Sequence, residues 1–540
     1  MKKKILIPIV AVMTLLGTVS FQSDFFEIAK QVEIFTTLFK ELNMNYVDET
    51  NPAELMDAAI GGMLDELDPY TKYWTEQEVE DAKINRSGDY SGIGATVRTE
   101  KEKLTIIEPR KGYAADNAGL KAGDEIIKIG DIDVAEFEGD AGDLLKGSAG
   151  TEIQITYVRQ GKSQTTTLKR SAVEVDAVPF YKLIDDNVGY IVLTKFNSKA
   201  SAQVKEALLS LKAEGAEKII LDLRGNGGGL LREAIAICNI FLPKGKLITT
   251  TKSVVKKYNK TYNTREEPID TEIPLVVLIN GRSASASEIV SGGLQDYDRA
   301  VVVGARSFGK GLVQRPKPLT YGTQLKVTIS RYYTPSGRCI QALDYWNRDD
   351  KGAAVRTDEA NYKEYKTANG RSVFDGGGVD PDIKISAAKM SSITKALASA
   401  NAIFDYATAY YYEHQYSDLS EFSFGDREYN DFKNYLKRTN FNYDTATEKS
   451  FEKALNQAKR DDLDDEIKSA YAALEQSIEK AKLSGLDTNK DEILGMLQDE
   501  IVKRYFYRDG LYEYQIATND AIAQAVAVLN DQNKYASILK

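Results

Sequence analysis

The stretch at residues 275–294 constrains the fold more than any other part of the chain. It begins with LVVLI, a short apolar run of the β-strand type, and passes through an Asn-Gly turn signal into a helix-type segment at 284–294. Strand-type runs also alternate with helix-type segments between residues 188 and 241. Such alternation predicts an α/β core. Ser285 then lies where a strand turns into a helix.

A lysine that can serve as a base follows in the next loop. Residues 300–303 form a second apolar run, and the glycine-punctuated loop after it holds Lys310, with Gln314 four residues further on. A serine hydroxyl becomes a useful nucleophile only when an adjacent base removes its proton. A lysine can do so near pH 7 if its pKa falls about 3 units from about 10.4, at a cost of roughly 4 kcal/mol. We therefore predict that Ser285 and Lys310 form a hydrolytic dyad.

Histidine, the more usual base, occurs once in the chain, as His414. It lies in a Tyr- and Ala-rich helical stretch and lacks the sequence context of a Ser-His-Asp triad. A histidine hydrolase therefore stays only as an alternative.

Three segments of this region resemble the C-terminal processing peptidases, also called tail-specific proteases. They are SASASEI, QDxxRAxxVG and SFGKGLVQ, in that order, and the resemblance covers most of the chain. It implies a crotonase- or ClpP-like α/β protease core. It also implies that Ser285 is the nucleophile, that Lys310, 25 residues later, is its base, and that Gln314 orients the lysine. The implied activity is that of a serine endopeptidase.

Each of these residues also has a structural interpretation. Serines at the start of a helix can cap it, and we assign that role to Ser283. Lys310 could be a solvated loop lysine. The sequence GARSFGKG also matches the phosphate-binding pattern GxxxxGK, but Gly311 replaces the Ser or Thr that would bind magnesium, and two prolines follow where that motif needs a helix. Nucleotide binding is therefore disfavoured.

A glycine-rich turn at 225–229 follows the strand-type run IILDL. It is not a dinucleotide fingerprint, because Leu230 takes the place of the third glycine. Glycines at a helix start let backbone N–H groups approach a developing oxyanion, and the helix dipole favours negative charge there. The resemblance implies that one oxyanion donor comes from this turn, for which we choose Gly228, and that the other is the N–H of Ala286.

Residues 88–173 consist of short β-type runs between glycines, and with YAADNAGLKAGDEIIKIGD in their middle they resemble a PDZ domain. Such domains bind the free carboxyl end of a peptide by adding it as a strand, with the carboxylate on backbone N–H groups of a glycine-rich loop. The matching loop, which we predict to bind peptide, consists of Gly92, Ile93, Gly94 and Ala95. A hairpin loop that needs glycine for a positive φ is the structural alternative.

The rest of the chain divides into four regions. Residues 1–23 carry three lysines and then an apolar run that is short for a spanning helix, which indicates a secretory signal or, alternatively, a membrane anchor. Residues 24–87 place apolar side chains at helical spacing on one face. We assign 174–385 to the protease core and 386–540 to a helical domain, whose role could be dimerisation, partner binding or shielding of the core.

Composition disfavours several kinds of partner. The 540-residue chain has the 42% hydrophobic and 28% charged residues of a soluble globular protein, and its net charge is −10, or −13 without Lys2, Lys3 and Lys4. This charge argues against nucleic acid or an acidic membrane surface as a partner. The two cysteines provide no disulfide framework, and no Cys/His cluster has metal-ligand spacing, so we expect no metal and no other cofactor.

We therefore expect a secreted or periplasmic serine endopeptidase that binds protein carboxyl-terminal tails through its PDZ domain and cuts upstream of them. A non-catalytic PDZ scaffold that only holds such tails is the alternative. Association with the inner membrane, a homo-oligomer and an adaptor protein stay open as further interactions.

Overall fold

The computed structural model of the protein describes residues 25–540, apart from 101, 186, 351, 386–389 and 462. The segment predicted to be a signal or an anchor, 1–23, therefore lies outside the described residues. Within the described ranges no helix combines the length and apolar character that crossing a membrane requires. The chain divides into two compact units. The smaller comprises Met1–Glu76 with Gln314–Thr328, and the larger comprises Gln77–Val313 with Ile329–Lys540.

In the smaller unit, a helix over residues 25–45 is followed by α2 (Pro52–Asp65) and the short strand β1 (Lys72–Trp74). The Asn51 side chain caps α2 by accepting hydrogen bonds from the N–H groups of the next turn. β1 pairs antiparallel with the first residues of β18 (Gln324–Tyr333). The apolar face that the sequence predicts for the first helix is solvent-exposed, at Phe25, Ile28, Val32, Phe35 and Leu42.

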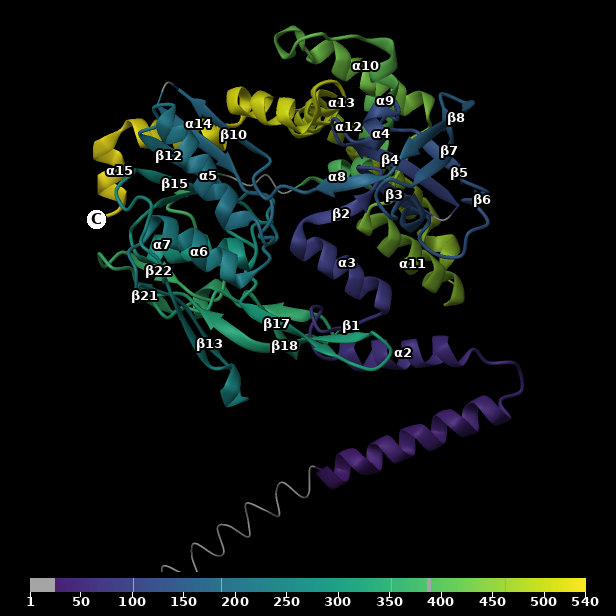
Figure 1. Cartoon of the computed structure of the whole chain (residues 1–540). Helices are drawn as coiled ribbons and strands as arrows, with labels where there is room; N and C mark the ends of the chain where they lie inside the picture. Colours follow the sequence, from purple (N-terminus) through teal and green to yellow (C-terminus); the bar gives the residue numbers. More distant parts are fainter. Residues whose placement is uncertain (1–24, 101, 186, 351, 386–389, 462) are drawn as a thin grey trace, which may run out of the picture. The chain divides into compact units, whose positions relative to one another are not determined.

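The PDZ-like segment forms an antiparallel sheet with a hydrophobic core of its own (Figure 1). Its strand order is β3-β4-β5-β7-β8, with β6 beside β5, and β2 pairs with β9. Alternate side chains of β7 are buried, as the period of a half-buried strand requires. The elements are β2 (Asp89–Gly92), β3 (Ala95–Glu100), β4 (Lys103–Pro109), α4 (Ala114–Asn117), β5 (Glu125–Ile129), β6 (Ile132–Asp133), η1 (Ala141–Leu145), β7 (Glu152–Arg159), β8 (Lys162–Lys169) and β9 (Ser171–Glu174). α3 (Glu76–Ser87) precedes them.

The α/β core predicted from the sequence is a six-stranded sheet in the order β10-β11-β12-β15-β16-β23. All neighbours are parallel except β10 and β11, and the central strands are rich in Val, Ile and Leu because both faces of the sheet are covered. α5, α6 and α7 supply the hydrophobic cluster on one face. The elements are β10 (Phe180–Ile184), β11 (Val188–Val192), α5 (Ala200–Ala213), β12 (Lys218–Asp222), α6 (Leu231–Phe241), β15 (Leu275–Ile279), α7 (Ala286–Asp296), β16 (Val301–Gly304) and β23 (Ile383–Lys384).

Further strands pair outside the six-stranded sheet. β13 (Leu247–Lys252) pairs with β14 (Lys260–Asn263) and with the last residues of β18, and β17 (Leu312–Pro318) also pairs with β18. Two short pairs follow, β19 (Leu343–Arg348) with β20 (Ala354–Arg356), and β21 (Glu364–Lys366) with β22 (Ser372–Phe374).

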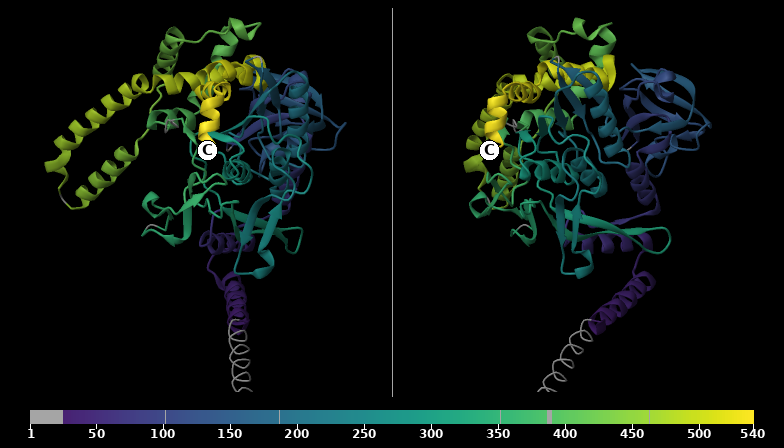
Figure 2. Two further views of the ribbon diagram at one scale, coloured as in Figure 1. Left: turned by 90° about the vertical axis from the view of Figure 1, so that its left-hand side faces the viewer. Right: turned by 60° about the vertical axis from the view of Figure 1, so that its left-hand side comes forward.

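The C-terminal region is helical, as predicted, and α11 and α12 form an antiparallel pair within it (Figure 2). One of its helices also completes the α/β core, because Ile522, Ala525, Val528 and Leu529 of α14 cover the second face of the six-stranded sheet. The region is thus more than an appendage to the core. The helices are α8 (Ser392–Ser399), α9 (Ala402–Glu413), α10 (Asp426–Arg438), α11 (Ala446–Arg460), α12 (Asp464–Thr488), α13 (Lys490–Thr518), α14 (Asp520–Asn530) and α15 (Gln532–Ile538).

Candidate active site

Ser285 lies in the turn between β15 and α7, at the junction that the sequence predicts. The helix begins at Ala286, two residues later than predicted, and Ser285 is its N-cap residue. Its backbone has φ 57° and ψ −109°, a conformation that costs a residue with a side chain about 1–3 kcal/mol. Ser285 itself is partly exposed, whereas its neighbours Ala284 and Ala286 are buried. The surrounding structure therefore holds one strained serine at an accessible point.

The capping role predicted for Ser283 is wrong. Ser283 is fully buried and precedes the helix by three residues, so its hydroxyl cannot reach the first turn as a cap. The hydroxyl instead donates to the Leu223 carbonyl at 2.8 Å and accepts from the Asn280 N–H at 2.9 Å. Ser283 thus ties together the loops that follow β12 and β15.

One buried carboxylate joins the segments of the two predicted dyad residues. Glu288 Oε2 accepts the Ser285 N–H at 2.7 Å and the Lys310 N–H at 2.9 Å. Its Oε1 accepts the Ser307 hydroxyl at 2.5 Å and the Gly309 N–H at 2.7 Å. The strand-to-helix turn and the lysine loop are therefore fixed to each other through a single side chain. Sequence reasoning missed Glu288, although Ser-x-x-Glu at a helix start is a capping-box signal that could have identified it.

Burial raises the pKa of the Glu288 carboxyl group, and the four hydrogen bonds act against that shift. A carboxyl group with a higher pKa in the folded protein contributes stability below its unfolded pKa, about 4.3 for glutamate. That contribution is lost as the pH rises through the folded pKa.

We therefore predict a pH-dependent difference between the protein and its Glu288→Gln variant, whose amide does not titrate. As the pH rises from about 4 to 7, the urea midpoint of the wild type should fall relative to that of the variant. Urea unfolding at several pH values measures this difference. Parallel pH profiles of the two proteins would contradict it.

The lysine loop does not have the structure of a nucleotide-binding loop. β16 leads into it, but the strand β17 follows at Leu312 where a phosphate-binding loop needs a helix. Its backbone N–H groups at Gly309 and Lys310 bind the Glu288 carboxylate instead of a phosphate. These contacts do not fit a phosphate-binding loop.

The glycine turn lies against Ser285. A Cβ atom added to Gly228, whose φ is +99°, would lie 2.7 Å from the Ala284 carbonyl oxygen and 2.9 Å from both the Ala286 nitrogen and the Ser285 Cβ. The two residues chosen as oxyanion donors, Gly228 and Ala286, are therefore neighbours in space. The Gly228 N–H donates to Asn226 Oδ1 at 2.9 Å in this structure.

Asn226 positions that turn, and sequence reasoning also missed it. Its side chain is fully buried and donates to the Leu193 carbonyl at 2.8 Å. The backbone carbonyl oxygen of Asn226 accepts hydrogen bonds from the Ala284 N–H at 3.0 Å and from the Ser287 hydroxyl at 2.8 Å. Asn226 thus links the ends of two core strands to the helix that begins after Ser285.

A second buried polar network lies before the glycine turn. Asp222, at the end of β12, accepts the Tyr190 hydroxyl at 2.6 Å and forms an ion pair with Arg224 at 2.6 Å. Arg224 also donates to Asn519 Oδ1 at 2.6 Å, just before α14. The turn is therefore tied to the C-terminal helices as well as to the sheet.

The other two candidate residues are Lys310 and Gln314. The Lys310 side chain is partly buried. Gln314 belongs to the smaller unit, where its amide donates to Thr328 Oγ1 at 3.1 Å. Thr328 donates in turn to Asp68 at 3.1 Å, in the turn between α2 and β1. His414, the alternative base, ends α9, where its ring stacks on Tyr410 at 3.8 Å and Nδ1 lies 3.1 Å from the Tyr410 carbonyl oxygen.

The PDZ-like sheet carries a groove of about 360 Å³. The predicted loop contributes Ile93 and Ala95 to its wall. Gly94 has φ +72°, and an added Cβ would lie 2.3 Å from the Tyr113 Cβ, so glycine is required there. Among the described residues, no hydrogen bond is found for the N–H groups of Ile93 and Gly94. Two backbone donors thus stand beside the groove.

Positive charge gathers in the same groove. Arg110, Lys146 and Lys195 line it, and Lys146 is paired with Asp81 of α3 at 2.7 Å. Burial lowers the pKa of Lys195, and the positive charges of Arg110 and Arg508 lower it further. A bound anion would relieve this repulsion, so the groove suits a carboxylate.

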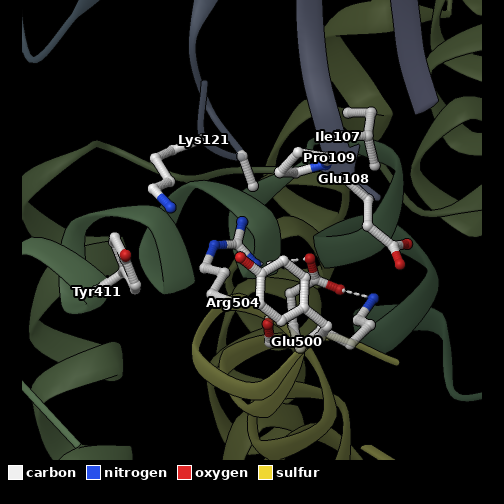
Figure 3. Close-up of a pocket in the computed structure, with 10 residues that line it drawn as sticks. Ile107, Glu108, Pro109, Lys121, Tyr411, Glu500 and Arg504 are labelled. Carbon is white, nitrogen blue, oxygen red and sulfur yellow. Dashed lines mark hydrogen bonds and ion pairs between the residues drawn. The ribbon is translucent and has the colours of Figure 1, made fainter. Parts of the chain in front are cut away.

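The PDZ-like segment is also held by the C-terminal helices. Arg508 forms two hydrogen bonds of 2.7 Å with Glu108, and the Tyr507 hydroxyl donates to Asp116 at 2.7 Å. Figure 3 shows the small pocket beside these contacts, where Glu500 and Arg504 face each other. Its volume of about 30 Å³ is suited to a water molecule and is far too small for a peptide.

Family models match three parts of the chain. They are peptidase family S41 over residues 187–345, the PDZ domain over 91–169, and the C-terminal helical domain of a probable PDZ-protease over 393–529. A probable CtpA-like serine protease of Staphylococcus aureus (strain MRSA252) is 32% identical over 379 residues, which cover 68% of this chain and 73% of the relative. A carboxy-terminal-processing protease of Bartonella bacilliformis is 35% identical over 323 residues, 58% of this chain and 73% of the relative.

Solved structures with similar chains include the photosystem II D1 C-terminal processing protease. It is 24% identical, with a TM-score of 0.37, and the match covers 66% of this chain and 88% of that one. The PDZ domain of a carboxy-terminal protease from Vibrio cholerae, solved in complex with a peptide, is 25% identical, with a TM-score of 0.15, over 16% of this chain and 99% of that one.

Proposed function

Because the chain belongs to the carboxy-terminal-processing serine proteases of peptidase family S41, we propose that Ser285 is its nucleophile and Lys310 the base that activates it. The observation that carries this proposal is the shared Glu288 oxygen, which accepts the N–H groups of both residues. The protein is a PDZ-containing protease that binds peptide or protein substrates. The proposed dyad supplies the groups that its reaction needs.

The reaction begins when the neutral Lys310 amine accepts the proton of the Ser285 hydroxyl and Oγ attacks the scissile carbonyl carbon. The Ala286 N–H and a donor of the glycine turn bind the oxyanion of the tetrahedral intermediate. As the C–N bond breaks, the Lys310 ammonium gives its proton to the leaving amine, and an acyl-enzyme ester remains. Lys310 then deprotonates a water molecule, which hydrolyses the ester and restores Ser285.

We assign the second oxyanion donor to Gly228. For this role the Gly228 N–H must break its hydrogen bond to Asn226 Oδ1 and donate to the substrate oxyanion instead. The alternative is that a neighbouring glycine of the turn donates. The role of Gln314 in orienting the Lys310 amine rests on its place in the sequence, four residues after the lysine.

We propose that the PDZ groove binds the free carboxyl end of the substrate. The carboxylate would accept the N–H groups of the loop at 92–95, and the cations of the groove would favour its charge. Residues upstream of the tail would then reach the dyad.

This assignment predicts that the protease distinguishes a carboxylate from an amide. Amidating the C-terminus of a peptide substrate should lower kcat/KM by roughly tenfold to a hundredfold, the value of a lost charge-assisted hydrogen bond. Mass spectrometry of the products gives the rates and the cleavage position. The matched control is a peptide with a free C-terminus and an amidated internal Asp. Equal rates for the free and amidated ends would contradict the proposed binding mode.

The alternative is a non-catalytic scaffold that uses the groove only to hold tails. It predicts binding of the tailed peptide without any new product. Appearance of cleaved peptide in the wild type and its loss in Ser285→Ala would exclude the scaffold.

Location and assembly are also proposals. The lysines and apolar run of 1–23 support export to an extracytoplasmic compartment, with release or anchoring as the two outcomes. N-terminal sequencing of the mature protein distinguishes them. The exposed apolar face of the helix at 25–45 is the surface that we assign to a homo-oligomer or an adaptor.

A further inference from the structure

The β13–β14 hairpin ends in a tip, residues 252–260, that carries an unusual combination of side chains. Val254 is 99% exposed and Val255 is 46% exposed, and no core residue covers either of them within the described ranges. Lys252, Lys256, Lys257 and Lys260 are exposed around them. Between residues 244 and 265 the sequence has six lysines and one arginine but no acidic residue. In Figure 1 the tip lies at the far end of β13.

Hydrogen bonds within the tip hold its backbone in a defined conformation. The Ser253 N–H donates to Asn259 Oδ1 at 2.6 Å, and Thr251 Oγ1 donates to the Tyr258 carbonyl at 2.6 Å. The Tyr258 N–H donates to the Val255 carbonyl at 3.0 Å, within the 3₁₀ turn η2 (Lys256–Tyr258). These bonds close the loop and fix its backbone. Val254 and Val255 are exposed although hydrogen bonds hold the loop that carries them.

The lysines of the tip are not neutralised by nearby carboxylates. Among the residues that the structure describes, no ion pair is found for Lys252, Lys256, Lys257 or Lys260. Lys252 and Lys257 instead lie over the rings of Tyr333 and Tyr258, at 4.4 and 5.2 Å. The strand residue opposite Lys252 is Arg331, which adds positive charge.

We propose that the hairpin tip binds the surface of a lipid bilayer that contains anionic lipids, with Val254 and Val255 entering the headgroup region and the lysines facing the phosphates. Exposed apolar side chains next to lysines in one loop combine the two contributions that hold peripheral proteins on such surfaces. A tip can insert two side chains without rearrangement of the sheet behind it. This proposal is independent of the assignment of the catalytic dyad.

The local charge decides this interaction, although the net charge of the chain is −10. Charges in solution are screened beyond about 10 Å at an ionic strength of 0.1 M, so acidic residues elsewhere contribute little at the tip. The negative net charge of the chain therefore does not prevent this hairpin from binding an acidic membrane surface. Lysines on the edge strand β14 also discourage strand pairing between molecules. That role does not account for two exposed valines beyond the end of the strand.

A fluorescent reporter at the tip tests the proposal on the full chain. Val254→Cys is labelled with an environment-sensitive NBD dye, and Trp346→Cys, an 85% exposed position on β19 beside Asp344, provides the matched control. The native Cys238 is buried, and burial raises the pKa of its thiol to about 12, which makes it a poor target for the dye. Cys339 is partly exposed, so it is replaced by serine in both labelled variants. The probes are vesicles of phosphatidylcholine with or without an equal part of phosphatidylglycerol.

We expect the emission of the Val254 label to shift to the blue with phosphatidylglycerol vesicles only, and that of the Trp346 label not to shift. Adding Lys256→Glu and Lys257→Glu should weaken the vesicle partition of the tip by about tenfold or more. Lys453→Glu with Lys459→Glu, which reverse the same charge on α11, should leave it unchanged. No shift with anionic vesicles, an equal shift with both vesicles, or a shift that grows with protein concentration without lipid would each overturn the proposal. The last result would indicate docking on another copy of the chain.

Discussion

Ser285→Ala and Lys310→Ala are each expected to abolish peptide cleavage, with a loss in kcat of roughly a thousandfold or more. Removing the serine deletes the atom that forms the acyl-enzyme. Removing the lysine leaves the hydroxyl without a base and the leaving amine without a proton donor. Because the two groups act as a unit, the double variant should lose no more activity than either single variant. Mass analysis of a tailed peptide after incubation measures the loss.

Lys310→Arg is the matched control for the lysine. Arginine keeps the positive charge but cannot lose its proton in a protein, so it cannot act as a base. If Lys310 only stabilises its loop through charge, this variant should retain activity. If Lys310 is the base, it should be as inactive as Lys310→Ala. Urea midpoints close to that of the wild type would exclude unfolding as the cause, and activity in Ser285→Ala or Lys310→Arg would contradict the dyad.

Gly228→Ala is expected to lower kcat by about a hundredfold, because a displacement of about 1 Å at a reacting group can have that effect. The new methyl group would meet the Ala284 carbonyl oxygen and the Ser285 Cβ at 2.7 and 2.9 Å. Both belong to the turn that presents the nucleophile, so the clash can be relieved only by moving that turn or the glycine itself.

Gly227→Ala provides the control within the same turn. An added Cβ at Gly227 meets no atom within 4 Å, and its φ is not positive. Its activity should therefore stay within a few-fold of the wild type. A comparison of kcat for the two variants also tests which glycine serves the oxyanion. An active Gly228→Ala with an inactive Gly227→Ala would contradict the assignment of Gly228.

The sequence predicts those parts of the site that depend on local order along the chain. The strand, turn and helix around Ser285, and the strand and loop before Lys310, are local patterns of hydrophobicity and glycine. The role of Glu288 could not be predicted in full. The capping pattern explains its bond to Ser285, but its bonds to Gly309 and Lys310 depend on how two loops meet.

Features that depend on tertiary arrangement were not predictable. The sequence predicts that residues 386–540 are helical, but not that one of their helices, α14, covers the second face of the protease sheet. Asn226 is an ordinary turn residue in the sequence and becomes a buried link only when strand ends converge. The basic tip of the β13–β14 hairpin was not predicted, because the net charge is an average over the whole chain. The hairpin brings several lysines and two exposed valines together in one loop.

The activation of Ser285 by Lys310 is tested most directly by covalent labelling with a fluorophosphonate, which reacts with activated serine hydroxyls. Peptide mapping by mass spectrometry should locate a single adduct on Ser285 in the wild type and none, or far slower labelling, in Lys310→Ala. An adduct on another serine with Ser285 unmodified, or equal labelling of Ser285 without the Lys310 amine, would contradict the mechanism.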